Sequence, residues 1–145
     1  MSDRLSVKAI VVGALVDVLA SMVGGFIAAV AAAVIVGLQA DPGADQVGAI
    51  STAFAESVPL ALIGIAAGSI GSIATGWVAA RIAGARHVLH GTLAASVLLP
   101  WALWSAFVSV SPLPRGLMIL LVPAGPALGA LGGLIAARRA GPARA

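Results

Sequence analysis

The sequence contains no cysteine, and only 9% of its 145 residues are charged. Without cysteine the chain cannot form a disulfide, a reactive thiol or a cysteine-bound zinc site. A soluble domain carries about a quarter charged residues, because its surface must be hydrated. This chain is instead 61% hydrophobic, with a mean hydropathy of +1.12. The scarcity of charge therefore excludes an ordinary soluble domain and predicts that lipid surrounds most of the chain.

The basic residues do not form a surface for nucleic acid, although the formal net charge is +3. Nucleic-acid-binding domains gather lysine and arginine into one patch or stripe. Here the basic residues stand at the ends of apolar runs, without interleaved aromatic residues. Phosphate-cradling loops, catalytic triads and zinc-protease motifs are also missing. We therefore expect no nucleic-acid partner, no enzymatic activity, no cofactor and no soluble substrate.

Four long apolar segments dominate the sequence. A membrane-spanning helix needs roughly 20 apolar residues. A cleavable signal peptide has an apolar region of only about 7–15 residues, so we interpret the first segment as a retained helix. The sequence predicts an all-α, polytopic membrane protein that forms one transmembrane domain over 1–145. Its expected spans are 9–38, 58–83, 88–110 and 117–137.

Lysine and arginine collect on one side of this four-span topology. Those on that side are Arg4, Lys8, Arg81, Arg86, Arg138, Arg139 and Arg144. Arg115 alone lies on the other side. The positive-inside rule then places both termini and the central loop in the cytoplasm, as in a multi-pass protein of the bacterial inner membrane. The expected cytoplasmic anchors, which could also hold anionic lipid headgroups, are Arg81, Arg86, Arg138 and Arg139.

The ends of the second and fourth spans resemble one another. GWVAARIAG at 76–84 and GLIAARRAG at 133–141 share six of nine residues at an offset of 57. A weaker similarity pairs Gly13 of the first span with Gly91 of the third. Two crossings per copy would give both copies the same orientation, which is a parallel repeat. The chain would then consist of two related helical hairpins, 1–83 and 84–145.

Small residues recur every four positions along the spans. Residues four apart share a helix face, and small residues allow helices to pack closely in membranes. The predicted packing ladder comprises Gly64, Gly68, Gly76, Gly125, Gly129 and Gly133. A further ladder on the first span comprises Gly13, Asp17, Ser21, Gly25, Ala29, Ala33 and Gly37. We interpret the ladders as packing seams within one bundle; a dimerisation surface or a pore lining is the functional alternative.

Proline interrupts the later spans. Pro100 in the third span, and Pro123 and Pro126 in the fourth, each remove a backbone donor, so both helices are expected to kink. The outer loop 39–57 separates the first two spans. Its apolar residues recur at three- and four-residue spacing, which favours a short amphipathic helix on the membrane surface. An extension of the second span is the alternative.

Asp17 is the charged side chain that lies deep within a span. An acid at the bilayer centre costs about 2.5–3.5 kcal/mol on insertion scales, so Asp17 should face other helices. Ser72 is expected at the same depth, because both residues lie nine positions from a basic residue at the same membrane face. The site would serve transport as a proton relay, cation site or counter-ion, or else hold helices together by a hydrogen bond. Its predicted members are Asp17, Ser21, Ser72 and Thr75.

His87 and His90 stand beside the loop between the second and third spans. Neither has a cysteine or carboxylate nearby in the sequence, so we interpret them as an interfacial titratable pair rather than a metal site. The surrounding stretch GSIGSIATGWVAARIAGARHVLHGTL resembles a pattern in small, uncharacterised four-helix membrane proteins of bacteria. There a glycine-rich helix ends in a basic turn, and His-Gly opens the next helix. The residues that carry the resemblance are Gly68, Gly71, Gly76, Arg81, His90 and Gly91.

The resemblance implies a four-helix membrane fold and no particular activity. Two hypotheses on function follow from the residues. The first is a structural or accessory membrane protein, whose partner is the lipid bilayer. The second is a small transporter or channel subunit that acts as a homo-oligomer through Asp17 and the glycine ladders. A polar cavity that reaches Asp17 would favour the second hypothesis.

Overall fold

A computed structural model of the chain describes residues 5–38 and 45–140, and its regular elements there are all helices. Within these residues, four stretches are helical and apolar over a length that can cross a membrane. They are Val7–Gly37, Val58–Ala83, His87–Val108 and Arg115–Ala140. Each begins and ends within three residues of its predicted bounds, so the expectation of an all-α chain with four apolar spans is confirmed. Residues outside the described ranges include Arg4, Gly141, Arg144 and the first part of the outer loop, 39–44.

The first span and the outer loop form two separate helices, α1 (Val7–Gly37) and α2 (Gln46–Glu56). Each begins at a side-chain cap. The hydroxyl of Ser6 accepts a hydrogen bond from the N–H of Ala9 at 3.3 Å, and the carboxylate of Asp45 accepts one from Gly48 at 3.1 Å. The loop therefore contains a short helix of its own, as its apolar spacing predicted.

The second span is one continuous helix, α3 (Val58–Ala83). Ser57 separates it from α2, because its extended backbone (φ −89°, ψ 107°) ends one helix while its hydroxyl caps the next. At the other end Gly84 adopts a left-handed conformation with φ 67°, which glycine tolerates without steric cost. Arg86 also has a positive φ of 48°. This tight turn reverses the chain into the third span.

The third and fourth spans are both broken. The third consists of α4 (His87–Ser96) and α5 (Leu99–Val108), and the fourth of α6 (Arg115–Leu121) and α7 (Ala124–Ala140). The breaks lie just before Pro100 and at Pro123, because proline cannot donate a hydrogen bond to the carbonyl four residues earlier. Pro126 was predicted to kink the fourth span. It lies instead in the first turn of α7, where its missing N–H has no intrahelical partner to lose.

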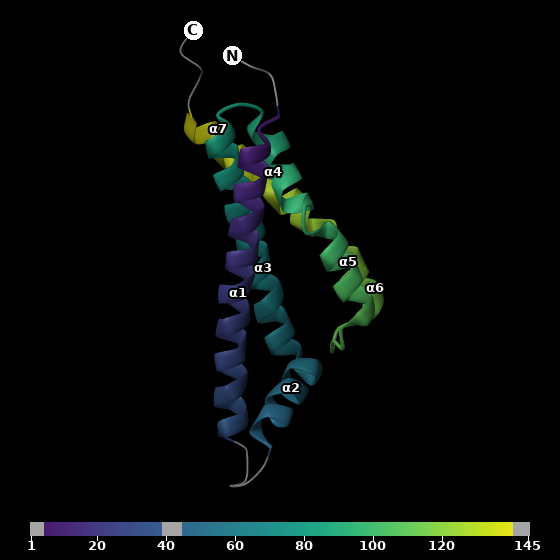
Figure 1. Cartoon of the computed structure of the whole chain (residues 1–145). Coiled ribbons are helices and arrows are strands. Elements are labelled where there is room, and N and C mark those ends of the chain that lie inside the picture. The colour runs from purple at the N-terminus through teal and green to yellow at the C-terminus, as the bar shows by residue number, and fades with distance from the viewer. Residues whose placement is uncertain (1–4, 39–44, 141–145) are drawn as a thin grey trace.

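The other three spans pack around α3, which contacts α1, α4 and α7. Figure 1 shows that α1 begins, and α3 and α7 end, at the same end of the bundle. We call this end the arginine end, because it carries Arg81, Arg86, Arg138 and Arg139. From there α5 and α6 lean away from α1 and α3, and they pack on each other (Figure 1). The bundle is therefore closely packed at the arginine end and spread toward the other.

Small residues fill the interior and large apolar residues face outward. Nearly all the buried apolar side chains are alanines, whereas Phe26, Ile70 and Leu120 are about 70% exposed. A water-soluble bundle has the opposite arrangement, since large side chains gain most from leaving water. Lipid tails are as apolar as leucine, so a helix in a membrane gains little by turning leucine inward. The distribution of side chains is thus that of a bundle suited to lipid.

Glycine backbones meet where α3, α4 and α7 cross. A Cβ atom on Gly129 would lie 2.6 Å from the carbonyl oxygen of Gly91 and 2.5 Å from Cβ of Ala95. One on Gly133 would lie 2.5 Å from the carbonyl oxygen of His87, and one on Gly76 would collide with the carbonyl of Gly129. No real side chain fits at these distances. Glycine at these positions is therefore what allows the three backbones to touch.

The predicted ladder does not continue along the whole of each helix. Its members Gly64 and Gly68 have no atom within 4 Å of a built Cβ, and Gly125 meets only the hydroxyl of Ser72 at 3.9 Å. The physical reason lies in the helix geometry. Four residues turn an α-helix by about 400°, so a strict spacing of four drifts by about 40° at each step. A straight contact line instead alternates steps of three and four.

Candidate functional site around Asp17

The first two spans cross along a face that contains Asp17. The carboxylic acid is only 7% exposed. It lies against Gly71 of α3, where a built Cβ would be 3.5 Å from Oδ1 of Asp17 and 3.0 Å from Cβ of Ala20. Further along α1, Gly24 makes the next close contact with α3, at Ala67. The carboxyl group thus packs beside Gly71, and the tighter approach at this glycine is to Ala20.

Thr75 is the polar neighbour of Asp17 on α3. Its side chain is fully buried and lies near the Asp17 carboxyl. The two groups do not form a regular hydrogen bond, so Oγ1 of Thr75 is left without a partner among the described residues. Asp17 and Thr75 therefore form a buried polar pair between α1 and α3.

The other two members of the predicted site lie elsewhere. Ser72 is buried, but its hydroxyl faces Gly125 of α7. Ser21 is exposed and lines a groove of about 440 Å³ between α1 and α5. The spacing of four from Asp17 to Ser21 carries the serine around the helix and off the contact line, which passes through Ala20 and Gly24. The polar site is smaller than the sequence predicted.

Asp17 is enclosed by packed helices. Grooves of about 310 to 440 Å³ lie between α1 and α3, α1 and α5, α3 and α7, and α5 and α6, and Asp17 lines none of these. The groove between α1 and α3 comes within one residue of it in sequence, through Val16, and also includes Gly71. The groove between α1 and α5 comes equally near, through Val18. Its walls also include Met22, Leu98 and Trp101, so it is mostly apolar. This arrangement gives the acid a contact between helices and no open polar route along these grooves.

His90 was predicted to lie in an interfacial pair, but its side chain is buried with 1% exposure. Its Nε2 accepts a hydrogen bond from the backbone N–H of Ser6 at 2.9 Å, and its Nδ1 lies 3.2 Å from the carbonyl oxygen of Arg86. An Nε2 that accepts must be unprotonated, so the proton is on Nδ1 and the ring is neutral. The adjacent Gly91 allows this burial by its close approach to α7. The His-Gly pair was the available sequence signal, but spacing alone could not show which partner the ring would meet.

His87 has a different role in the turn between α3 and α4. Its Nδ1 lies 3.0 Å from the carbonyl oxygen of Ala80, near the end of α3. Ala80 also accepts a hydrogen bond from the N–H of Gly84. No group of three or more histidine, aspartate and glutamate side chains in the described residues could hold a metal ion. The two histidines are thus fixed to backbone groups of three different helix ends.

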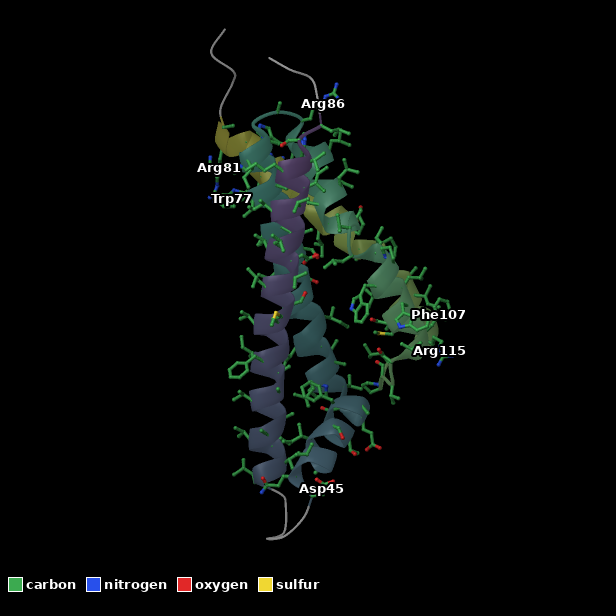
Figure 2. All side chains as sticks on the ribbon, in the orientation of Figure 1. Asp45, Trp77, Arg81, Arg86, Phe107 and Arg115 are labelled. Carbon is green, nitrogen blue, oxygen red and sulfur yellow. The ribbon has the colours of Figure 1, made fainter. Side chains whose placement is uncertain are left out.

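The arginine end carries exposed cations. Arg81, Arg138 and Arg139 are exposed at the ends of α3 and α7, and Arg86 is exposed in the turn before α4. The guanidinium of Arg81 lies 5.2 Å from the centre of the Trp77 ring, which is a cation–π contact. Figure 2 shows Arg81 and Trp77 together at the side of the bundle, with Arg115 at the distant tip of the α5–α6 hairpin.

Fold and site together define a small helical bundle with four candidate membrane spans and one buried acid between the first two. Comparison of the chain with known protein families, with characterised proteins and with solved structures finds no match.

Proposed function

We propose that this protein is a multi-pass protein of the inner membrane with a structural or accessory role. The observation that carries the proposal is the enclosure of Asp17 between α1 and α3, against Gly71 and beside Thr75. A transport site must be reached by its substrate, and Asp17 lines none of the four grooves described above. A buried acid packed beside a buried hydroxyl group of the next helix supports association of the helices instead.

The second candidate is a small oligomeric transporter or channel subunit that uses Asp17. One observation favours it. The Thr75 hydroxyl is buried without a regular partner, so the polar pair has unused hydrogen-bonding capacity within the membrane. Intramembrane acids in pumps and transporters form proton relays of this kind. Further copies of the chain would have to complete the route.

Ion flux in liposomes separates the two candidates. The full chain and Asp17→Asn would be reconstituted at equal density, and proton and potassium flux measured with internal dyes under an imposed gradient. Asp45→Asn is the matched control, because Asp45 is an exposed helix cap far from the site. We expect all three proteins to match empty liposomes. Flux through the wild type and Asp45→Asn that is lost in Asp17→Asn would contradict the structural role.

The proposed orientation places the arginine end in the cytoplasm. The distribution of basic residues supports it, since Arg115 is the one lysine or arginine assigned to the other side. Because the chain lacks cysteine, Ala85→Cys and Ser109→Cys each introduce a single thiol, one at either end. A membrane-impermeant maleimide applied to intact cells should label Ser109→Cys and leave Ala85→Cys unlabelled until the membrane is opened. The reverse pattern would overturn the orientation.

The proposal also includes two related hairpins. It is supported by α3 and α7, which end at the same end of the bundle (Figure 1), and by the aligned Gly13 and Gly91. Gly13 lies close to Thr75 and Ala79 of α3, while Gly91 lies close to α7. The alignment places Ala95 where Asp17 stands, so the acid belongs to the first hairpin alone.

A further inference from the structure

The groove between α3 and α7 near the arginine end has a mostly apolar wall and one cationic side chain. It measures about 310 Å³ and is lined by Ile70, Ile73, Ala74, Trp77, Ile135 and Arg139. Four of these are aliphatic, so most of its wall is a surface for hydrocarbon. Arg139 stands at the end of α7 and is exposed. A groove of this kind matches the parts of a phospholipid, whose acyl chain ends at a phosphate.

A second guanidinium stands beside the same groove. Arg81 follows Trp77 by one helical turn and lies over its ring at 5.2 Å. The ring itself forms part of the groove wall. The cation–π contact therefore holds the Arg81 charge against the wall. Arg139 of α7 thus lines the groove itself, and Arg81 of α3 lies over the Trp77 ring that forms part of its wall.

Arg81 and Arg139 have no protein counter-ion in the described residues. Neither side chain forms an ion pair there, and Arg81 contacts the Trp77 ring. Asp17 is enclosed between α1 and α3. Of the exposed acids, Asp45 caps α2 and Glu56 ends it, and Figure 2 shows Asp45 at the opposite end of the bundle. Charge complementarity thus favours an anionic occupant over a zwitterionic one.

Trp77 adds an unused hydrogen-bond donor. Its Nε1 is buried and has no acceptor among the residues that the structure describes. Tryptophan at a membrane interface places its ring in the apolar region and directs its N–H to a polar partner. Nε1 is not accessible from the groove as placed, so a lipid ester or phosphate oxygen would supply that acceptor only once the indole turns its N–H outward.

We propose that this groove is a binding site for an anionic phospholipid. The phosphate lies between Arg139 and Arg81, and one acyl chain runs along Ile70, Ile73 and Ile135. The inference rests on the membrane insertion included in the proposed function, and it adds a site of defined position and lipid class. The remaining surface of the spans contacts lipid without selecting a headgroup.

Quenching of Trp77 fluorescence by brominated lipid tests this site. The full chain with Trp101→Phe and Trp104→Phe retains Trp77 as its one tryptophan. It would be reconstituted in phosphatidylcholine vesicles that contain a stepwise increasing fraction of either phosphatidylglycerol or phosphatidylcholine with dibrominated acyl chains. The dependence of quenching on that fraction gives the relative association constant of the two lipids. We expect phosphatidylglycerol to be preferred, by roughly fivefold for each arginine that contacts it.

Arg139→Gln and Arg81→Gln should each lower the preference by roughly that factor. Arg139→Lys should keep most of it, since the charge remains. Arg115→Gln is the matched control at the opposite end and should leave the preference unchanged. Equal quenching by the two lipids would overturn the site while leaving membrane insertion intact. Absence of quenching by either lipid would place Trp77 outside the acyl region and contradict the insertion as well.

Discussion

The Nε2 atom of His90 accepts a hydrogen bond from the backbone N–H of Ser6 at 2.9 Å, across a separation of 84 residues. Ser6 is also the cap of α1. The bond therefore fixes the beginning of the first helix to the first turn of α4. It closes the arginine end of the bundle, where α1, α3, α4 and α7 come together.

His90→Ala should detach the beginning of α1. The change leaves the N–H of Ser6 without an acceptor, which costs about 1–3 kcal/mol, and it removes a fully buried ring. His87→Ala is the matched control, because the carbonyl of Ala80 keeps its hydrogen bond from Gly84. The measurement is the free energy of unfolding in mixed micelles, together with amide exchange at the start of α1. Equal losses of unfolding free energy in the two variants would show that the Ser6–His90 hydrogen bond stabilises the bundle no more than the His87 contact does.

Gly129→Ala should be the more damaging of two alanine substitutions in α7. Its Cβ would lie 2.5 Å from Cβ of Ala95, so α4 and α7 must separate. Overpacking of this kind typically costs about 1–3 kcal/mol. Gly125→Ala is the control, since its nearest neighbour is 3.9 Å away, and its stability should change by less than about 0.5 kcal/mol. Equal thermal unfolding midpoints in the two variants would contradict the requirement for glycine where α4 and α7 cross.

Asp17 and Thr75 should be energetically coupled. A double-mutant cycle of Asp17→Ala and Thr75→Val removes each partner alone and then both. Hydrogen bonds between membrane helices average about 0.6 kcal/mol and reach about 1.7 kcal/mol, and we expect a coupling energy in that range. The control cycle pairs Ser21→Ala with Thr75→Val and should give none, because Ser21 is exposed on another face. A coupling of zero in both cycles would remove the structural role assigned to Asp17.

Pro100→Ala should reduce the divergence of α5 from α1. Alanine restores the N–H that can bond the carbonyl of Ser96, so α4 can continue into α5 without a break. A kink of about 20° over the 10 residues of α5, roughly 15 Å, displaces its end by about 5 Å. Spin labels on Ser21→Cys and Ser105→Cys would measure the change as a distance distribution.

The Pro59→Ala variant is the control for that measurement. Pro59 lies in the first turn of α3, where proline disturbs no intrahelical bond, so the label distance should stay as in the wild type. The same distribution in Pro100→Ala and the wild type would show that another feature sets the position of α5.

Local pattern was enough to place the helices in this chain. The length of the apolar segments predicted the four spans, and the N–H that proline lacks predicted the breaks near Pro100 and Pro123. These features depend on each segment's own backbone and solvation, so no knowledge of neighbours is needed. The prediction for Pro126 failed only because the break came three residues earlier and left that proline in a first turn.

The site depended on neighbours, and the sequence specified it only in part. The cost of burying a charge indicated that Asp17 faces protein, and Thr75 is indeed beside it. Ser21, Gly64 and Gly68 were misplaced because a spacing of four drifts around the helix, while the actual contact line depends on where the helices cross. His90 and Ser6 are too far apart in the chain for spacing to relate them.

The sequence by itself determined that the chain is helical, apolar and divided into four spans, since these properties follow from each segment's length and composition. Only the tertiary structure decided which side chains meet. Helix crossings are set by the closest approach of whole surfaces, such as the glycine backbones of α3, α4 and α7. That packing buries His90, pairs Asp17 with Thr75, and brings Trp77 and Arg139 to one groove.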